Sequence, residues 1–335
     1  MSEPWRYRLS SSDVEAIDGA IESCLAPEDG IDDEALRRIA MTAPELPRAL
    51  RQLCYDFRVM EPDCGALVIS GLPVDDEGLG PTPSHWLTAN SRARREQCYL
   101  SLVASLVGDP MAWATQQDGR IIHHVFPIRE HEHEQLGTGS RELLWWHTED
   151  AFHPLRPDYV GLFCLRNPDR TPTTLASLER LPLADRDVDR LFKPHFTIRP
   201  DNSHQATNQG DQGRGVSYDH IEAMNANPDR IPVLSGDRAS PYLRLDPYFM
   251  DQAATEPEAQ RALESLIAHI DSRLSDLVLQ PGDVCLIDNY KAVHGRRAFA
   301  ARYDGTDRWL LRINVTRDLR KSRHCRPSAR SRVLH

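Results

Sequence analysis

The sequence lacks the features of membrane proteins and of disulfide-stabilised secreted scaffolds. No apolar run approaches the roughly 20 residues that a membrane-spanning helix needs, and the N-terminal stretch 1–6 has no signal-peptide hydrophobic region. The seven cysteines are scattered and none belongs to a C-x-x-C pair, so neither a disulfide framework nor a cysteine zinc site is indicated. We therefore expect a cytoplasmic protein with reduced thiols.

An excess of basic residues is also missing. The 40 lysines and arginines are outnumbered by 50 acidic residues, which gives a formal net charge of -10. Proteins that bind nucleic acid or anionic membranes usually present a positive surface, so neither partner is expected. There is no internal repeat and no low-complexity segment. The length of 335 residues and the 40% hydrophobic content are sufficient for a sizeable core.

The spacing of apolar residues changes character near residue 111. Before it, segments 10–57 and 96–107 show helical spacing around one short apolar strand within 64–73. After it, short β-like runs follow at 121–126, 143–148, 159–165, 174–178, 195–198, 233–234, 242–245, 284–287 and 309–315, with a helix over 256–277. This pattern predicts a mainly β protein with flanking helices, in which two sheets pack together.

We expect a single domain over residues 1–335 with three parts. A mostly helical part (1–110) packs on a β core (111–316), and a basic tail (317–335) follows. Such a charge run usually forms a solvated, partly disordered end, and no function is assigned to it.

The stretch 143–153 contains the first candidate site, because an apolar run leads directly into His147 and Glu149. On a strand these two side chains point the same way. An imidazole and a carboxylate side by side provide two of the three ligands of a 2-His-1-carboxylate site for Fe(II). An isolated H-x-E at a solvent-exposed strand end would look the same, so the remaining ligand must come from elsewhere.

The C-terminal third supplies a third ligand and two cations. His294 follows a buried strand and a loop, and it is expected to be exposed. Arg308 and Arg312 share one face of the strand over 308–316. Buried arginines need anions to neutralise them, and the planar guanidinium binds carboxylates in a bidentate manner. An edge strand with both arginines facing water is the alternative.

Together these residues resemble the signature of the Fe(II)/2-oxoglutarate-dependent oxygenases, in particular the clavaminate synthase-like branch. The resemblance extends over about 113–318 and includes the stretches 146–154, 157–160, 164–169, 173–177 and 281–283. It implies a jelly-roll or cupin-like double-stranded β-helix core. It also implies Fe(II) held by His147, Glu149 and His294, with 2-oxoglutarate and O2 as co-substrates. Arg308 and Thr174 are the implied 2-oxoglutarate ligands, although Thr173 is close enough to compete.

Within that branch the chain is most similar to hydroxylases of free amino acids, especially the arginine type. The resemblance implies a small-molecule amino acid pocket, with Arg312 on the substrate α-carboxylate. The other implied substrate contacts are Glu149, Gln116 or Gln117 and Thr138 around the amine, and Asp201 and Asp246 around the side chain. Tyr248 stands where the arginine hydroxylases tend to carry a second aspartate. The loop 131–134, although rich in His and Glu, is expected to be a solvated or lid loop and not a metal site.

The implied reaction is hydroxylation of C3 or C4 of a free basic L-amino acid, with L-arginine favoured, releasing succinate and CO2. Lysine, ornithine, citrulline, a cyclic arginine derivative and desaturation are open alternatives. Carrier-tethered substrates are less compatible with Arg312, because a thioester has no free carboxylate. A non-catalytic jelly-roll binding module would be expected to have lost a ligand, and a zinc hydrolase does not usually need an arginine for a dicarboxylate.

Overall fold

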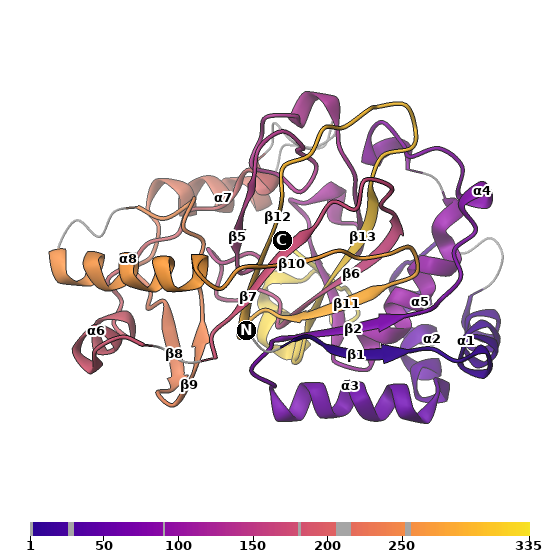
Figure 1. Cartoon of the computed structure of the whole chain (residues 1–335), viewed down its shortest axis with the longest axis horizontal. Coiled ribbons are helices and arrows are strands. Elements are labelled where there is room, and N and C mark those ends of the chain that lie inside the picture. Colours follow the sequence, from indigo (N-terminus) through magenta and orange to yellow (C-terminus); the bar gives the residue numbers. More distant parts are fainter. Residues whose placement is uncertain (1–2, 26–29, 90, 180–181, 206–215, 252–255) are drawn as a thin grey trace.

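Two β-sheets packed face to face form the centre of the molecule (Figure 1). The computed structural model describes residues 3–25, 30–89, 91–179, 182–205, 216–251 and 256–335. The larger sheet has the order β1 (Trp5–Arg8), β2 (Ala66–Ser70), β11 (Val284–Asp288), β6 (Tyr159–Arg166), β13 (Trp309–Thr316), β3 (Asp109–Trp113), β14 (Val333–Leu334), and β4 (Ile122–Val125) also pairs with β13. The smaller sheet has the order β10 (Ser275–Leu277), β7 (Thr173–Ser177), β12 (Ala292–Arg296), β5 (Leu144–His147).

The central strands are buried on both faces, and side-chain alternation divides their residues between two cores. On β6, Val160 and Leu162 point into the space between the sheets, where they meet Leu175 of β7 and Ala292 of β12. Phe163, the residue after Leu162, points outward to a second core. Strands of both sheets therefore contribute side chains to the core between the sheets, as in a jelly roll.

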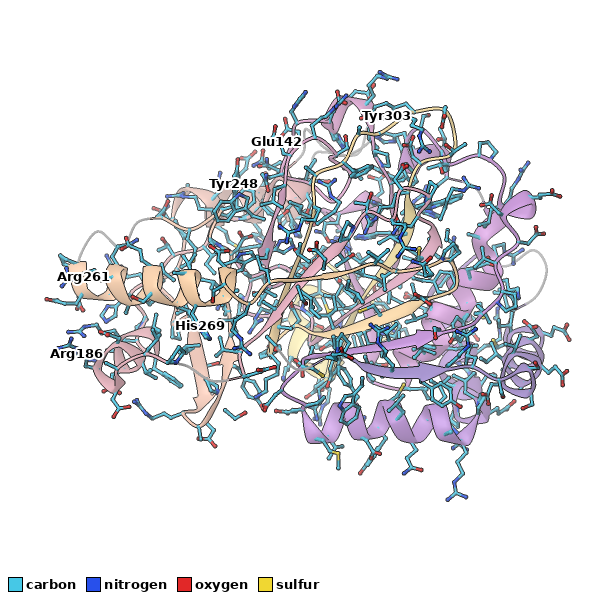
Figure 2. All side chains as sticks on the ribbon, viewed as in Figure 1. Glu142, Arg186, Tyr248, Arg261, His269 and Tyr303 are labelled. Carbon is cyan, nitrogen blue, oxygen red and sulfur yellow. The ribbon has the colours of Figure 1, made fainter. Side chains whose placement is uncertain are left out.

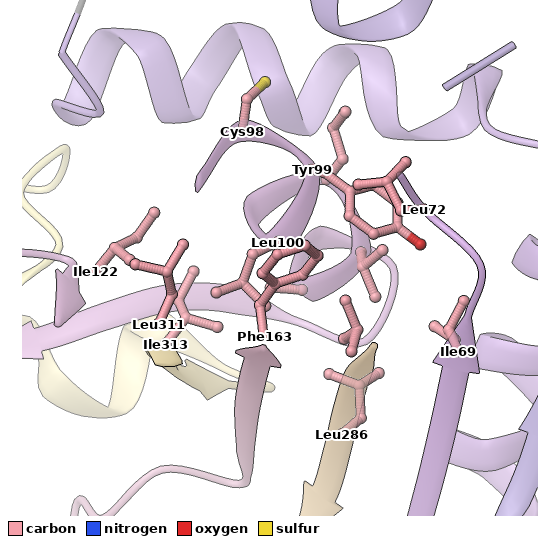
Figure 3. Packing of buried hydrophobic residues seen from close by; sticks show 14 of the residues in the cluster. Ile69, Leu72, Cys98, Tyr99, Leu100, Ile122, Phe163, Leu286, Leu311 and Ile313 are labelled. Carbon is pink, nitrogen blue, oxygen red and sulfur yellow. The ribbon is translucent and has the colours of Figure 1, made fainter. Parts of the chain in front are cut away.

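Helices from the N-terminal third cover the outer face of the larger sheet. They are α1 (Ser11–Cys24), α2 (Asp33–Thr42), α3 (Arg48–Met60) and α5 (Arg94–Ser105), with a short α4 (Asp76–Leu79). Figure 3 shows Phe163, Leu311 and Ile313 of the sheet facing Tyr99 and Leu100 of α5. Tyr99 and Phe163 meet edge to face, with ring centroids 6.0 Å apart.

The outer face of the smaller sheet is covered by α6 (Asp185–Leu191), α8 (Pro257–Asp271) and the hairpin of β8 (Leu234–Asp237) and β9 (Ser240–Leu243). Figure 1 shows these elements on the side opposite the N-terminal helices, with α7 (Val216–Ala226) above them. Trp146 and Val293 fill the interface beneath α8. Short 3-10 turns complete the chain at Ala43–Glu45, Trp86–Thr88, Ser91–Ala93, Gln117–Gly119, Arg129–His131, Asn202–His204 and Leu319–Cys325.

The mainly β architecture with flanking helices, a double-stranded β-helix, is confirmed. The helix predicted over 256–277 ends at Asp271, and Ser275–Leu277 forms β10 instead. The segment predicted as a strand at 195–198 forms only isolated bridges. The tail expected to be partly disordered is packed, since Val333 and Leu334 pair with β3. Among the described helices, none is long and apolar enough to cross a membrane.

Candidate active site

Three side chains converge between the sheets. Two of them belong to neighbouring strands, β5 and β12, and the third belongs to the turn that follows β5. His147 of β5 and His294 of β12 are directly opposite each other in the antiparallel register. Glu149 follows His147 by two residues, and its Oε2 lies 3.8 Å from His147 Nε2 and 3.4 Å from His294 Nε2. The ligand atoms of all three lie within 4.8 Å of one another. His294, which was expected to be exposed, is only 7% exposed because β12 is an inner strand.

The protonation of these groups is consistent with a metal-binding role. His147 Nδ1 lies 2.8 Å from the carbonyl oxygen of Trp145. A carbonyl accepts only, so Nδ1 carries a proton and Nε2 is the nitrogen directed to the metal position. Burial lowers the pKa of His147, but Glu149 and Asp246 outweigh it and raise that pKa to about 9, so a metal bound at Nε2 would displace a proton. Burial favours the protonated form of Glu149, but Arg312 and the two histidines outweigh it and hold the pKa of Glu149 well below its usual range. Two imidazoles and an ionised carboxylate with open positions beside them fit Fe(II).

The backbone at Glu149 is fixed by a buried amide side chain. Asn289 Oδ1 accepts the backbone N–H of Glu149 at 2.7 Å, and Asn289 Nδ2 donates to its carbonyl at 3.0 Å. The same Nδ2 donates to the carbonyl of Pro157 at 2.8 Å. Asn289, in the loop before β12, therefore ties the Glu149 turn to the strand that carries His294.

The pocket that contains these ligands has a positively charged end. Arg308 is 6% exposed and lines the pocket, and burial lowers its pKa to about 10. Its Nη2 donates to Thr173 Oγ1 at 3.2 Å, and Thr173 lines the pocket as well. Thr174, the threonine assigned to this role from the sequence, is absent from the pocket lining, and its Oγ1 would lie 2.8 Å from a Cβ built on Gly295. The structure thus places Thr173, and not Thr174, beside Arg308.

A second arginine, which sequence reasoning missed, lines the same end. Arg296 on β12 is 3% exposed, and its pKa is lowered to about 9, first by burial and then by the charge of Arg308. Its guanidinium donates to backbone carbonyls of the loop before β5. The available signal was its position two residues after His294, which places both side chains on one face of a strand.

Arg312 lies next to the triad and joins three acceptors. Its Nη1 donates to Glu149 Oε1, while its Nη2 donates to Gln116 Oε1 at 3.2 Å and to His123 Nδ1 at 2.6 Å. His123 is the Cα partner of Arg312 across β4 and β13, and burial holds its pKa well below the usual range, which keeps the ring neutral. His123 was not anticipated, because its proximity to Arg312 depends on a strand pairing that the sequence does not reveal.

The residues expected around the substrate amine are only partly brought together. Gln116 contacts Arg312 and donates to Ser203 Oγ at 2.6 Å. Gln117 is occupied by the backbone of His124, which it both donates to and accepts from. Thr138 lies 2.8 Å from His131 Nδ1. Gln116, Gln117 and Thr138 line a second, adjoining pocket and not the one that contains the triad.

The opposite end of the main pocket is acidic. Asp201 and Asp246 both line it, and among the described residues neither forms an ion pair. Asp246 Oδ1 accepts the backbone N–H groups of Tyr248 at 3.2 Å and Phe249 at 3.4 Å. Burial raises the pKa of Asp246 to about 6; the nearby His147 ring opposes this rise, and the charge of Asp201 adds to it. The rings of His147 and His204 offset part of the charge of Asp246 and Asp201, but among the described residues no lysine or arginine pairs with either carboxylate, so the two favour a cationic ligand.

Aromatic rings flank this acidic end. Tyr248, labelled in Figure 2, lines the pocket and is 52% exposed. Trp145 also lines it and is 38% exposed, on the same face of β5 as His147. Tyr248 packs edge to face against Phe249, with ring centroids 5.0 Å apart. Two partly exposed aromatic side chains therefore line the pocket together with its carboxylates.

A second cluster of possible metal ligands, Asp150, Asp201 and His204, is largely satisfied by protein contacts. Asp150 accepts from Trp113 Nε1 at 2.6 Å and from Asn314 Nδ2 at 3.1 Å, and its Oδ1 lies 3.0 Å from His204 Nε2. The other His204 nitrogen lies 2.7 Å from a threonine hydroxyl, that of Thr115. We interpret this network as a support for the Glu149 turn, since Asp150 adopts a left-handed φ of 50° there.

Comparisons with known proteins bear on this geometry. Residues 63–314 match the profile of the taurine catabolism dioxygenase TauD, TfdA family. The chain is 45% identical to enduracididine beta-hydroxylase of Streptomyces hygroscopicus, with 98% of each chain covered. It is 44% identical to L-ornithine/L-arginine 3-hydroxylase of Catenulispora acidiphila, with 98% of this chain and 99% of the relative covered.

A solved structure matches over almost the same range. The crystal structure of the non-heme iron oxygenase OrfP in complex with Fe, succinate and (3S)-hydroxy-L-Arg superposes with a TM-score of 0.94 at 41% identity. The match covers 98% of this chain and 99% of that one. Another structure of OrfP contains Fe and alpha-ketoglutaric acid.

Proposed function

This chain belongs to the TauD/TfdA family of dioxygenases, and we propose that it hydroxylates a side-chain carbon of free L-arginine. It is an enzyme that uses iron and 2-oxoglutarate. The names of two relatives, a beta-hydroxylase and a 3-hydroxylase, support C3 as the site of reaction over C4.

We assign the iron to His147, Glu149 and His294, whose donor atoms converge between the sheets. When bound, iron with O2 and 2-oxoglutarate supplies the oxidising power, and 2-oxoglutarate is converted to succinate and CO2. The remaining tasks belong to the protein: it must hold the C–H bond beside the metal and exclude water. Arg308 and Thr173 are proposed to bind the carboxylate of 2-oxoglutarate that is remote from the metal, because they form the positively charged end of the same pocket.

The substrate is proposed to span the other half of the pocket. Arg312 would release Glu149 Oε1 and bind the α-carboxylate, which leaves that oxygen for the substrate amine. Gln116 and His123 hold the guanidinium of Arg312 in reach. Asp201 and Asp246 would then receive the cationic side chain. Gln117 and Thr138 are assigned supporting roles, through His124 and His131 respectively.

The observation that carries this proposal is the order of charges along one pocket. Three arginines (Arg296, Arg308 and Arg312), an iron-binding triad and the carboxylates of Asp201 and Asp246 line a single cavity. A zwitterion with a cationic side chain complements that order, whereas a neutral side chain would leave the buried Asp246 and the half-buried Asp201 without a cationic ligand.

A second substrate, a cyclised arginine derivative, is favoured by one feature. Tyr248 offers a ring face beside Asp246, and a planar cyclic guanidine would stack on such a ring better than an ammonium group does. The similarity to enduracididine beta-hydroxylase is in agreement with this alternative.

The test is an assay of the purified chain with Fe(II), ascorbate and 2-oxoglutarate against arginine, a cyclic arginine derivative, ornithine, lysine and citrulline. Succinate release and a product heavier by one oxygen atom are expected first with arginine or its cyclic derivative. No substrate-dependent succinate with any member of the panel would overturn the proposal. A product lighter by two hydrogens would establish desaturation in place of hydroxylation.

A further inference from the structure

The loop 135–142 forms one wall of the iron pocket, and a buried arginine fastens it to the strand that carries His294. Leu136 and Gly137 of the loop line the pocket. Arg296 Nη1 donates to the carbonyl of Gly139 at 2.7 Å, and its Nη2 donates to the carbonyl of Glu142 at 3.1 Å. A single guanidinium thus bridges both ends of the turn that follows the pocket wall.

Other contacts attach the same loop to the smaller sheet. Gln135 Nε2 donates to the carbonyl of Leu143 at 2.7 Å, and Gln135 Oε1 accepts the N–H of Trp145 at 3.2 Å. These bonds occupy the free edge of β5, the last strand of its sheet. Across the turn, the N–H of Phe299 donates to the carbonyl of Ser140 at 2.9 Å. Arg296 is the contact among these that carries a charge.

The positive charge of Arg296 lies near that of Arg308, which also has no anionic partner in the described ranges. Arg296 and Arg308 both line the pocket, and the charge of Arg308 is near enough to add to the lowering of the pKa of Arg296 that burial causes. Within the described part of the chain, neither guanidinium forms an ion pair with a carboxylate. Carbonyl oxygens solvate Arg296 but do not neutralise it. A dicarboxylate at Arg308 would offset the repulsion and strengthen the attachment of Arg296 to the loop.

We propose that Arg296 is a positioning residue that couples the binding of 2-oxoglutarate to closure of the loop 135–142 over the iron pocket. The proposal rests on the assignment of Arg308 to 2-oxoglutarate. It implies that the loop 135–142 is most rigid after 2-oxoglutarate has bound. The amino acid substrate would then bind to a fully formed pocket. Loss of the contact would let the reaction proceed without a well-placed substrate.

The experiment measures amide hydrogen exchange across the loop, without O2, in the Fe(II)-loaded enzyme with and without 2-oxoglutarate. Calorimetry of 2-oxoglutarate binding accompanies it. In the wild type, 2-oxoglutarate should slow exchange at Gly139, whose N–H donates to the carbonyl of Leu136, and at Ser140 and Arg141, whose N–H groups donate to the carbonyl of Glu132 just before the loop. In Arg296→Met, exchange without ligand should rise about tenfold or more, and the slowing by 2-oxoglutarate should disappear. Arg296→Lys keeps the charge but cannot bridge two carbonyls, and it should show the same defect in weaker form.

The control is Arg297→Met, which removes an equal charge from the next residue. Arg297 pairs with Asp276 on the surface, 2.8 Å away, and it should behave as the wild type. Under turnover, Arg296→Met should release more succinate per hydroxylated product than the wild type or the control variant. If 2-oxoglutarate does not bind the wild type, the proposed function fails. If it binds but the loop does not respond, or if Arg296→Met retains the full response, the coupling is wrong.

Discussion

The substitution Asp246→Asn tests the acidic end of the pocket most directly. The amide keeps an oxygen that can accept the N–H groups of Tyr248 and Phe249, so the local turn should survive. What is removed is a charge that is buried and that, among the described residues, no lysine or arginine pairs with. Stability and activity should therefore change in opposite directions.

The effect on stability follows from the pKa of Asp246, which burial raises from 3.8 to about 6. The folded state thus resists ionisation of this group, and the cost at neutral pH is about 3 kcal/mol. The cost is absent below pH 4 or so, grows as the pH rises to about 6, and is complete above that. Asp246→Asn should raise the free energy of unfolding of the ligand-free protein by up to about 3 kcal/mol at pH 7.5, and by progressively less toward pH 4.

The effect on activity has the opposite sign. A charge-assisted hydrogen bond contributes roughly 1.5–3 kcal/mol, so kcat/KM for arginine should fall about 10- to 150-fold. The loss should be much smaller for citrulline, whose ureido group is neutral. In the wild type, kcat/KM for arginine should also fall as the pH drops below about 6, and this limb should flatten in the variant.

Urea unfolding and initial-rate kinetics measure the two effects. Asp237→Asn is the matched control, because Asp237 is exposed in the β8–β9 hairpin and should change neither quantity. Asp246→Asn with unchanged kcat/KM and unchanged preference for arginine over citrulline would refute the placement of the substrate side chain. Increased stability without that loss of preference would mean that Asp246 is strained but does not contact the substrate.

Three further predictions concern the metal and the co-substrate. His147→Ala should abolish hydroxylation and lower the Fe(II) content of the protein, and turnover of this variant at the wild-type rate would refute the metal assignment. A chelator should inactivate the wild type reversibly. Arg308→Gln should raise KM for 2-oxoglutarate at least tenfold, whereas Arg312→Gln should raise mainly KM for the amino acid, and the reverse result would exchange their roles. Thr173→Val should raise KM for 2-oxoglutarate severalfold and Thr174→Val should not, as steady-state kinetics with varied 2-oxoglutarate would show.

Sequence patterns were sufficient for the parts of the fold in which apolar spacing is strong. The inner strands β6 and β13 are eight residues long and rich in apolar residues, and both were anticipated. β12 was not, because Ala292–Arg296 contains histidine, glycine and arginine and becomes a strand only through its pairing with β5 and β7. That pairing buries His294, which explains why an exposed histidine was expected and a buried one is found.

The candidate site shows a similar division. His147, Glu149, His294, Arg308 and Arg312 were all identified from the sequence, and the structure brings them into one pocket. The choice between the neighbouring threonines, Thr174 predicted and Thr173 found beside Arg308, could not be made from the sequence for a physical reason. Adjacent residues on a strand point to opposite faces, so the selection depends on a register that the sequence does not display.

The arrangement of unpaired charges connects the stability of the fold to the choice of ligands. Arg296 and Arg308 lie at one end of the pocket, Asp201 and Asp246 at the other, and the triad residues separate them. If the two ends touched, the opposite charges would pair, and the pocket would lose its preference for charged ligands. Held apart, each end destabilises the ligand-free fold and is relieved only by a ligand of opposite charge. A dicarboxylate would neutralise the arginines, and a cationic amino acid would neutralise the aspartates. The two sets of charges together therefore select this pair of substrates more strongly than any single contact does.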